Sequence, residues 1–406
     1  MKVLQINKYF YRKGGADTVF FNTMRMLEER GHEVVPFALR NEKNLRSDYE
    51  QYFVPYPELG ESSLGEKVRR APSFVYNRRA AAMLEKLLKA ERPDIAHVHL
   101  MFNSLSVSIL PVLRKYGIPV VMTVHDYRLI CPAYLFTDGN GRICERCKTG
   151  NYYNCILRRC SKGRLFNSLM LASDSYFRRY IIKPIDYVDR FIFVSRFAME
   201  KHIEFSAKYA GKSEVLPNFT PLLPCAAVAK GDYCLYIGRI SEEKGIPTLV
   251  EAVKGSGIQL RVAGTGPLLE SLRRQSPPNV EFTGHKSGDE LYDYIRRARF
   301  VVVPSECYEN NPMSVIEAMT LGTPVIGSRI GGIPELIEDG LNGYLFEPGS
   351  PRDLRLTLDK ALSMPADKYD TLRREAQTFA RANFGEEAYY RKLITLYNNT
   401  ILNYNE

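Results

Sequence analysis

Apolar residues along the chain recur in two alternating patterns, and the alternation predicts parallel β-sheets covered by helices. Short, nearly continuous apolar runs are typical of buried strands, and they occupy 2–10, 33–39, 94–100, 118–127, 189–195, 232–239, 258–264, 279–284, 299–305, 323–328 and 343–348. Apolar positions three and four residues apart indicate helices between them, including 18–30, 80–91, 247–255, 289–299 and 386–399. We therefore predict an α/β protein with doubly wound sheets.

A proline-rich segment, VLPNFTPLLP at 215–224, divides the alternation into two halves. Each half has enough strands for a sheet of its own, and 406 residues are enough for two full domains. We predict one domain over 1–218, a second over 219–384 and a final helical segment over 385–406. Ligands of such sheets bind outside the carboxyl ends of the strands, so we expect the functional residues there.

Two glutamates eight positions apart, Glu309 and Glu317, flank the expected start of a helix in ENNPMSVIEAM. We predict Asn311 as the N-cap and Pro312 in the first turn. The unpaired amides of a first turn bind anions, so the order is carboxylate, anion site, carboxylate. That order matches the hydroxyls and the diphosphate of a nucleoside diphosphate sugar. A solvated glutamate before an ordinary amphipathic helix is the alternative.

Further candidate residues follow other predicted strands. Gly14 and Gly15 precede a helix that we expect to open at 16–17, and glycines there let backbone amides approach a phosphate or a sugar. His125 ends a strongly apolar strand and is positioned to hydrogen-bond a sugar hydroxyl. Arg239 and Lys244 follow a strand of the second half and supply two cations for a diphosphate. Plain turns and surface cations are the alternatives.

Two other features are interpreted as structural. His97 and His99 alternate along a strand, and we expect one to face the core and the other the helix layer. The sequence VAGTGP at 262–267 lacks the third glycine of a phosphate-binding fingerprint, so it is interpreted as a turn.

The net charge of +10 is unevenly distributed. Residues 1–218 carry 35 Lys and Arg against 22 Asp and Glu, whereas 219–406 carry 21 against 24. The basic first half suggests an anionic partner such as a membrane surface, a phosphorylated acceptor or a nucleic acid, although solvated faces are an alternative. The first segment turns polar after six residues, and no apolar run reaches the length of about 18 expected of a membrane helix, so we expect a cytoplasmic protein.

Five of the eight cysteines lie within the insert 131–160. Their spacing, C-x2-C and then C-x4-C, predicts a small structural zinc site held by Cys144, Cys147, Cys155 and Cys160, for one of which Cys131 could substitute. Free thiols or a redox-labile pair are the alternative, since cytosolic reductants oppose stable disulfides. Basic residues adjoin the insert, which makes it a candidate contact for an acceptor or a membrane.

Over essentially its whole length the chain resembles the retaining GT-B glycosyltransferases of glycosyltransferase family 4. The motifs that carry this resemblance are KGGAD at 13–17, TVHDY at 123–127, YIGRISEEKG at 236–245 and the pair Glu309 and Glu317, followed by GTPVIGSRIGGIPELIEDGLNGYLFEPG. The resemblance implies two Rossmann-like domains with parallel sheets that face each other across a cleft, the second binding the donor. It also implies that 385–406 crosses back to the N-terminal domain.

The resemblance implies a role for each candidate residue. Glu309 would contact the hydroxyls of the donor sugar, Glu317 those of the ribose, and His125 would lie against the transferred sugar. The diphosphate would be bound by Gly14, Gly15, Arg239 and Lys244, and by the amides near Asn311, Met313 and Ser314. Many relatives have glycines where this chain has 310–312, and Pro312 removes one amide, which puts the phosphate contacts there in doubt.

The resemblance therefore implies a retaining hexosyltransferase that needs no metal for catalysis. The expected donor is a UDP-sugar first and a GDP-sugar next, and the expected acceptor is a glycan or a lipid-linked glycan at the inner face of the membrane. A nucleotide-sugar epimerase or hydrolase of the same fold is the first alternative. A basic zinc-knuckle protein that binds nucleic acid is the second, and it leaves both glutamates and the cation pair unexplained, so we expect no nucleic-acid partner.

Overall fold

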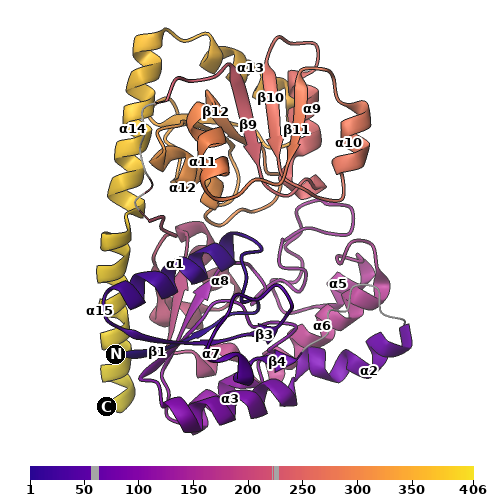
Figure 1. Cartoon of the computed structure of the whole chain (residues 1–406). Helices are drawn as coiled ribbons and strands as arrows, with labels where there is room; N and C mark the ends of the chain where they lie inside the picture. The colour runs from indigo at the N-terminus through magenta and orange to yellow at the C-terminus, as the bar shows by residue number, and fades with distance from the viewer. Residues whose placement is uncertain (56–63, 222, 224–227) are drawn as a thin grey trace. The chain divides into compact units, whose positions relative to one another are not determined.

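The computed structural model describes residues 1–55, 64–221, 223 and 228–406, without the side chains of 64 and 66–70. Positions 222 and 224 of the predicted linker, and Cys225, lie outside the described residues. The described chain forms two compact units, one of residues 1–216 with 389–406 and the other of 217–388 (Figure 1). These boundaries lie two and four residues from the expected ones.

The first unit is built on a six-stranded parallel sheet with the strand order β2-β1-β5-β6-β7-β8. Its strands are β1 (Lys2–Ile6), β2 (Glu33–Phe37), β5 (Ile95–Val98), β6 (Val120–Val124), β7 (Arg190–Phe193) and β8 (Ser213–Val215). A separate pair consists of β3 (Leu39–Arg40) and β4 (Val54–Pro55). The helices are α1 (Gly15–Glu29), α2 (Leu64–Val75), α3 (Arg78–Glu91), α4 (Ile109–Lys115), α5 (Tyr153–Leu157), α6 (Leu165–Tyr180), α7 (Pro184–Tyr187), α8 (Arg196–Phe205) and α15 (Glu386–Asn405).

The second unit repeats this plan with the strand order β11-β10-β9-β12-β13-β14, again all parallel. Its strands are β9 (Tyr233–Ile237), β10 (Gln259–Ala263), β11 (Val280–Gly284), β12 (Phe300–Val303), β13 (Val325–Ser328) and β14 (Gly343–Phe346). Its helices are α9 (Ile246–Val253), α10 (Leu269–Gln275), α11 (Gly288–Arg297), α12 (Met313–Thr320), α13 (Pro351–Leu362) and α14 (Ala366–Phe384).

Hydrophobic burial explains why each apolar run forms a strand. The central strands β1, β6, β9 and β12 are buried along almost their whole length, as parallel strands covered on both faces must be. The strand order reverses beside β1 in one sheet and beside β9 in the other, and such switch points place loops where ligands bind. The predicted α/β class with two doubly wound parallel sheets is confirmed.

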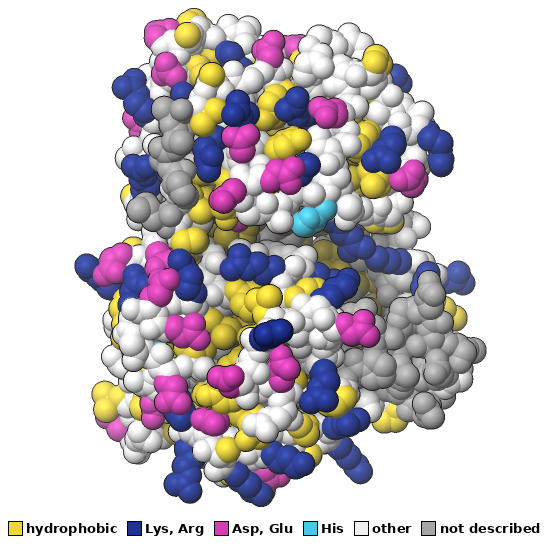
Figure 2. Space-filling view, viewed as in Figure 1, with side chains coloured by type: hydrophobic (Ala, Val, Ile, Leu, Met, Phe, Trp, Pro, Cys, Tyr) yellow, Lys and Arg dark blue, Asp and Glu magenta, His cyan; other side chains and the backbone are white. Residues whose placement is uncertain are grey.

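The sequence missed the short strands β3, β4 and β8, which have only two or three residues each. No helix among the described residues combines the length and the apolar character required to cross a membrane. On the face drawn in Figure 2, basic and acidic side chains are interspersed and hydrophobic side chains are scattered among them.

Candidate functional site

An ion pair joins two of the predicted site residues at the carboxyl ends of β9 and β12. Lys244 Nζ lies 2.5 Å from Glu309 Oε1, and the hydroxyl of Ser305 donates to the same oxygen at 2.7 Å. The Glu309 side chain is only 13% exposed, against 30% for Lys244. Burial alone would raise the pKa of Glu309, but the Lys244 charge and the two hydrogen bonds keep this pKa below its usual 4.5. Glu309 is therefore an anion at neutral pH.

Close backbone contact fixes the loop that carries Lys244 against the end of β12. Gly245 has a φ of +67°, and a Cβ there would lie 1.8 Å from the carbonyl oxygen of Pro304. The Glu306 amide donates to the Glu243 carbonyl at 3.0 Å, which links the same two loops. Only glycine allows this approach, so Gly245 determines where Lys244 meets its partner.

A pair of glycines, Gly331 and Gly332, holds the backbone of Glu309 from the side of β13. Gly331 has a φ of +61°, and a Cβ there would lie 2.4 Å from the Glu309 carbonyl oxygen. The Gly332 amide donates to that oxygen at 2.7 Å. Both the side chain and the main chain of Glu309 are therefore positioned.

The prediction for the start of α12 is wrong. The helix begins at Met313 and Pro312 occupies the N-cap position, so Asn311 lies before the cap. Instead, Asn311 Oδ1 accepts the amide of Asn218 and the Asn311 carbonyl accepts Asn218 Nδ2, both at 2.9 Å. Because proline offers no donor, the first free helix amide belongs to Met313.

The remaining predicted residues of the second unit lie on α12 and after β9. Ser314 and Glu317 are three residues apart on one partly exposed face of α12, while Met313 is buried. Arg239 is exposed in the loop after β9.

The loop after β9 is fixed by the VAGTGP segment. A Cβ on Gly264 would lie 1.8 Å from the carbonyl oxygen of Gly238, and one on Gly266 would lie 2.2 Å from that of Ile240. The interpretation of this segment as a simple turn is therefore incomplete, because its glycines permit the close packing of the loop that carries Arg239.

In the first unit, the predicted glycines lie at the start of α1. The helix begins at Gly15, one residue earlier than expected, and Gly14 is its N-cap. Asp17 is buried beneath this loop, where it accepts the amides of Lys13 and Gly14 and a 2.9 Å hydrogen bond from Asn7 Nδ2. The sequence does not indicate a role for Asp17 of the KGGAD motif, whereas its hydrogen bonds in the structure fix the glycine loop.

His125 directly follows β6 and ends a chain of buried hydrogen-bonding groups. Its Nε2 lies 3.0 Å from His99 Nδ1, and His99 Nε2 lies 3.1 Å from Gln5 Oε1. Gln5 Nε2 donates to the hydroxyl of Tyr397 on α15, which lies 2.6 Å from His97 Nδ1. The expectation that His97 and His99 face opposite layers is wrong, because residues two apart share one face of a strand and both enter this relay.

The placement of the Gln5 amide sets the direction of the relay. Gln5 Nε2 donates to the Tyr397 hydroxyl, so the hydroxyl proton is left for His97 Nδ1, 2.6 Å away. The carbonyl of Gln5 then accepts the Nε2 proton of His99. His97 in turn donates through Nε2 to Thr123 Oγ1 at 2.7 Å.

The three histidines of the relay are neutral. Burial lowers the pKa of His97 and that of His125 to about 3, and lowers the pKa of His99 well below 6.5. A neutral His99 protonated on Nε2 accepts at Nδ1, so His125 must donate through Nε2. His125 therefore carries no proton on Nδ1, and this atom acts only as an acceptor.

The cysteines of the insert lie close together. Cys147 and Cys155 pack with Tyr152 and Ala172 in a small buried cluster with Cys160 at its edge. Burial, followed by the nearby Cys131, Cys160 and Cys144, raises the pKa of the Cys147 thiol to about 12.

These thiols do not form a metal site as they stand. All the described cysteines are free, and no group of three or more His, Cys, Asp or Glu within the described ranges is arranged to hold a metal ion. The zinc site stays a prediction of the spacing.

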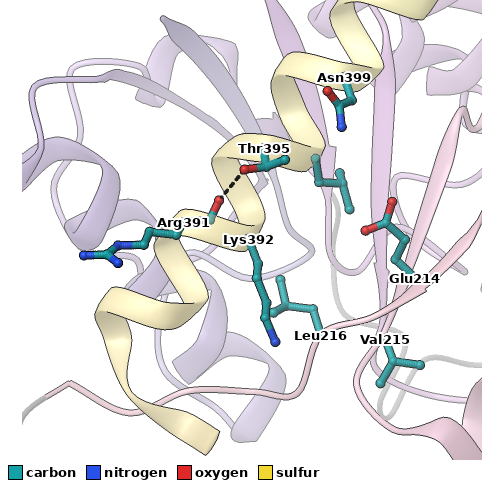
Figure 3. A pocket seen from close by; sticks show the side chains of 8 residues that line it. Glu214, Val215, Leu216, Arg391, Lys392, Thr395 and Asn399 are labelled. Carbon is teal, nitrogen blue, oxygen red and sulfur yellow. Dashed lines mark hydrogen bonds between the residues drawn. The ribbon is translucent and has the colours of Figure 1, made fainter. Parts of the chain in front are cut away.

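A pocket of about 270 Å³ lies in the first unit between β8 and α15 (Figure 3). Side chains of both elements line it, namely Glu214, Val215, Leu216, Arg391, Lys392, Thr395, Leu396 and Asn399. None of the predicted site residues is among them, so we do not assign the pocket to the donor or the acceptor.

The first half of the chain matches the family model described as Glycosyltransferase Family 4 over residues 13–222, and the second half matches that of Glycosyl transferases group 1 over 226–379. A glycosyltransferase of Methanocaldococcus jannaschii is 26% identical over 362 residues, which are 87% of this chain and 86% of that protein. The sulfoquinovosyl transferase of Arabidopsis thaliana is 35% identical over 156 residues, 34% of this chain and 30% of its own length.

Solved structures share the fold at low sequence identity. HepE from Anabaena, in complex with UDP-glucose, has a TM-score of 0.68 at 16% identity, over 98% of this chain and all of that one. Sucrose-phosphate synthase from Thermosynechococcus elongatus has a TM-score of 0.71 at 20% identity, over 98% of each chain. With both family models matched and the GT-B fold in place, the chain belongs to glycosyltransferase family 4 and is a glycosyltransferase.

Proposed function

We propose that this glycosyltransferase transfers a hexose or N-acetylhexosamine from a nucleotide sugar to a glycan or lipid-linked acceptor, with retention of anomeric configuration. The observation that carries the proposal is the partly buried ion pair of Lys244 and Glu309 beside the first turn of α12. A UDP-sugar is our first choice of donor and a GDP-sugar the second. The complex of HepE with UDP-glucose supports that order.

The charges of the second unit fit the two ends of such a donor. Lys244 and Arg239 neutralise the diphosphate, and the Met313 and Ser314 amides at the start of α12 add donors for its oxygens. Glu309, held as an anion, accepts hydrogen bonds from sugar hydroxyls. Glu317 accepts those of the ribose.

Retention is proposed to proceed without a covalent intermediate. Because Lys244 lies 2.5 Å from one Glu309 oxygen and Ser305 donates to the same oxygen, this carboxylate is a poor nucleophile. The glycosidic bond to the diphosphate breaks first and gives an oxocarbenium-like ion pair. The acceptor hydroxyl then attacks on the face that the diphosphate has left, and its proton passes to a diphosphate oxygen.

His125 is proposed to orient the transferred sugar rather than to move a proton. With a pKa of about 3 it stays neutral through the physiological range, so Nδ1 is an acceptor rather than a cationic donor. Such an atom accepts a hydrogen bond from a sugar hydroxyl. We therefore expect the pH dependence of the activity to show no protonation of a basic group near pH 6.

Calorimetric titration with UDP, GDP and ADP, without added metal, tests the donor site. We expect one nucleotide to bind with micromolar affinity and its binding to weaken at least tenfold in Glu317→Ala and in Arg239→Ala. Glu251→Ala and Arg273→Ala, on exposed helix faces of the same unit, are the matched controls and should bind like the wild type. Equal affinities in all five proteins would contradict the proposed donor site.

Product analysis separates the proposal from its alternative. With a labelled nucleotide sugar and a membrane extract as acceptor source, a transferase gives a lipid- or glycan-linked product whose anomeric coupling constant matches the donor's. An epimerase or hydrolase instead converts the donor without any acceptor. Release of free sugar at the same rate with and without extract would favour hydrolysis.

We propose a cytoplasmic location with peripheral attachment to the inner face of the membrane, because a lipid-linked acceptor is presented there. The positive charge of residues 1–218 supports attachment to an anionic surface.

We also propose that the insert 131–160 holds a structural zinc through Cys144, Cys147, Cys155 and Cys160, with Cys131 as a substitute ligand. The spacing supports this, whereas the present arrangement of the thiols does not. Elemental analysis of protein purified without added metal is the test. One zinc per chain should be lost in Cys147→Ser and kept in Cys234→Ser, a buried cysteine of the other unit. A metal-free wild type would leave the cysteines as buried thiols.

A further inference from the structure

Exposed hydrophobic side chains are concentrated on two neighbouring helices of the first unit. Of the eleven large hydrophobic side chains found exposed among the described residues, six fall between positions 153 and 181. They are Tyr153 (51% exposed), Leu157 (74%), Leu165 (53%), Leu169 (46%), Tyr180 (63%) and Ile181 (66%). We call this set, with the adjoining exposed Arg159, Lys162 and Arg164, the α5–α6 surface.

Helical geometry places most of these side chains together. Leu165, Leu169 and Tyr180 are four and fifteen residues apart on α6, spacings that return to one side of a helix. Tyr176, on the same side, accepts a 3.1 Å hydrogen bond from the Tyr153 amide, so α5 lies beside this face. Tyr153 and Leu157 are four apart and share a side of α5.

The charges along this segment are almost all positive. Residues 151–183, all of them described, contain seven Lys and Arg and a single acidic residue, Asp174. Asp174 is buried and bound to the equally buried Arg178 at 2.9 Å, so it offers no negative charge to the surface.

Leucines and tyrosines next to exposed cations match the chemistry of an anionic lipid bilayer. The apolar side chains enter the boundary between headgroups and acyl chains, tyrosine lies at the headgroup level, and the cations meet lipid phosphates. A second copy of this chain would bring like charges together. A nucleic acid would leave the leucines in water. The combination therefore favours a membrane over either alternative.

We infer that the α5–α6 surface is the membrane-docking surface of this protein, with α6 lying in the plane of an anionic bilayer. The inference rests on the proposed peripheral location and makes it specific to named side chains. Leu157, Leu165 and Leu169 insert, while Arg159, Lys162 and Arg164 bind headgroup phosphates. Attachment concentrates the enzyme where a lipid-linked acceptor is found.

Vesicle co-sedimentation of the full chain tests this inference. We expect binding to vesicles of phosphatidylglycerol with phosphatidylcholine, little binding to phosphatidylcholine alone, and weakening with added salt. Arg159→Gln/Lys162→Gln/Arg164→Gln should lose about fivefold in affinity per charge, on the order of 100-fold in all. Leu157→Ser/Leu165→Ser/Leu169→Ser should lose about tenfold or more.

Matched controls have the same chemistry elsewhere on the chain. Leu341→Ser/Leu356→Ser/Leu402→Ser removes leucines that are 45%, 59% and 60% exposed, and Lys254→Gln/Arg273→Gln/Arg355→Gln removes three cations of the second unit. Both controls should sediment like the wild type. Circular dichroism melts of every variant establish that it is folded.

Three outcomes would overturn the inference. These are a wild type that fails to sediment with the anionic vesicles, surface variants that bind as tightly as the wild type, and a dimer in solution that the leucine variant dissociates. The last would identify a second copy as the occupant. Nucleotide titration on the same samples separates this result from the proposed function, because a failed donor site would abolish UDP binding and leave sedimentation unchanged.

Discussion

The two units share one architecture but hold their candidate site residues by different forces. In the second unit a charged pair, Lys244 and Glu309, is fixed by glycines that let neighbouring loops touch. In the first unit His125 is held by a chain of neutral hydrogen-bonding groups that reaches Tyr397. The second unit thus supplies fixed charge, and the first supplies a fixed pattern of hydrogen-bond donors and acceptors. The carboxyl ends of the strands can therefore carry either a charged pair or a set of neutral hydrogen-bonding groups in the same fold.

Removing the charge of the second unit should have the largest effect. Glu309→Gln keeps the shape but loses the ion pair and the carboxylate acceptor, so we expect a loss on the order of 100-fold in kcat/KM. Lys244→Met leaves Glu309 without its cation, raises the carboxyl pKa and costs about 2 kcal/mol of stability, a moderate value because Lys244 is 30% exposed. Chemical denaturation and initial rates measure both. Additive effects in the double variant would argue against coupling.

Adding one methyl group to a glycine of the second unit should disrupt its loop scaffold. Gly245→Ala and Gly331→Ala place a Cβ 1.8 Å and 2.4 Å from carbonyl oxygens, so we expect a loss of about 2 kcal/mol or more in the free energy of unfolding. The control is Gly255→Ala, where φ is also positive at +65° but no atom lies within 4 Å. It should cost only about 1 kcal/mol of backbone strain. Equal losses in all three would mean that strain, not contact, dominates.

Lowering the pH should destabilise the first unit before it destabilises the second. His97 and His125 have a pKa of about 3 when folded but titrate near 6.5 when unfolded, so below pH 6.5 only the unfolded state takes up their protons. The contribution of the neutral histidines to the free energy of unfolding is fully present above that pH. It falls as the pH drops, by up to about 1.4 kcal/mol per pH unit for each histidine. Glu309, with its lowered pKa, adds acid sensitivity only below 4.5. Calorimetric scans should show the first unit unfolding first, and a shared transition at every pH would contradict this.

The smallest effect on stability is expected from a change that reverses the direction of the hydrogen bonds in the relay of the first unit. Gln5→Leu removes the acceptor of the His99 Nε2 proton, so His99 should move its proton to Nδ1, and His125 should follow. Nitrogen chemical shifts of the labelled imidazoles report the tautomers directly, and the cost should be about 1 kcal/mol. Thr123→Val, at the other end of the relay, is the control and should leave His125 unchanged. If the His125 tautomer were also unchanged in Gln5→Leu, the relay would not determine the orientation of its proton.

The amino-acid pattern was sufficient for the fold because burial on both faces makes each parallel strand a continuous apolar run. It missed β8, which has only three residues and lies at the edge of its sheet. Pairing with β7 rather than composition defines such a strand. Local rules also failed at Asn311, where a capping residue binds Asn218, which lies 93 positions away.

Site residues could be predicted from the sequence only where the residue type itself indicates a role. Glycine pairs and paired glutamates indicate a binding site by their residue type and spacing. The ion pair of Lys244 with Glu309, in contrast, depends on the contact between two loops 65 positions apart. Ser305, Gly331 and Gly332 were not predicted for the same reason. The partnership of Tyr397 with His97 spans 300 positions, and only the folded chain brings it together.

The discontinuity of the first unit has a consequence for the order of synthesis. Residues 217–388 form a continuous unit that can fold as soon as it leaves the ribosome. The first unit, although translated earlier, must wait for 389–406, because Leu393, Leu396 and Tyr397 complete its core. The half that is made first therefore matures last, and its exposed apolar surface must be protected while the second unit is being translated.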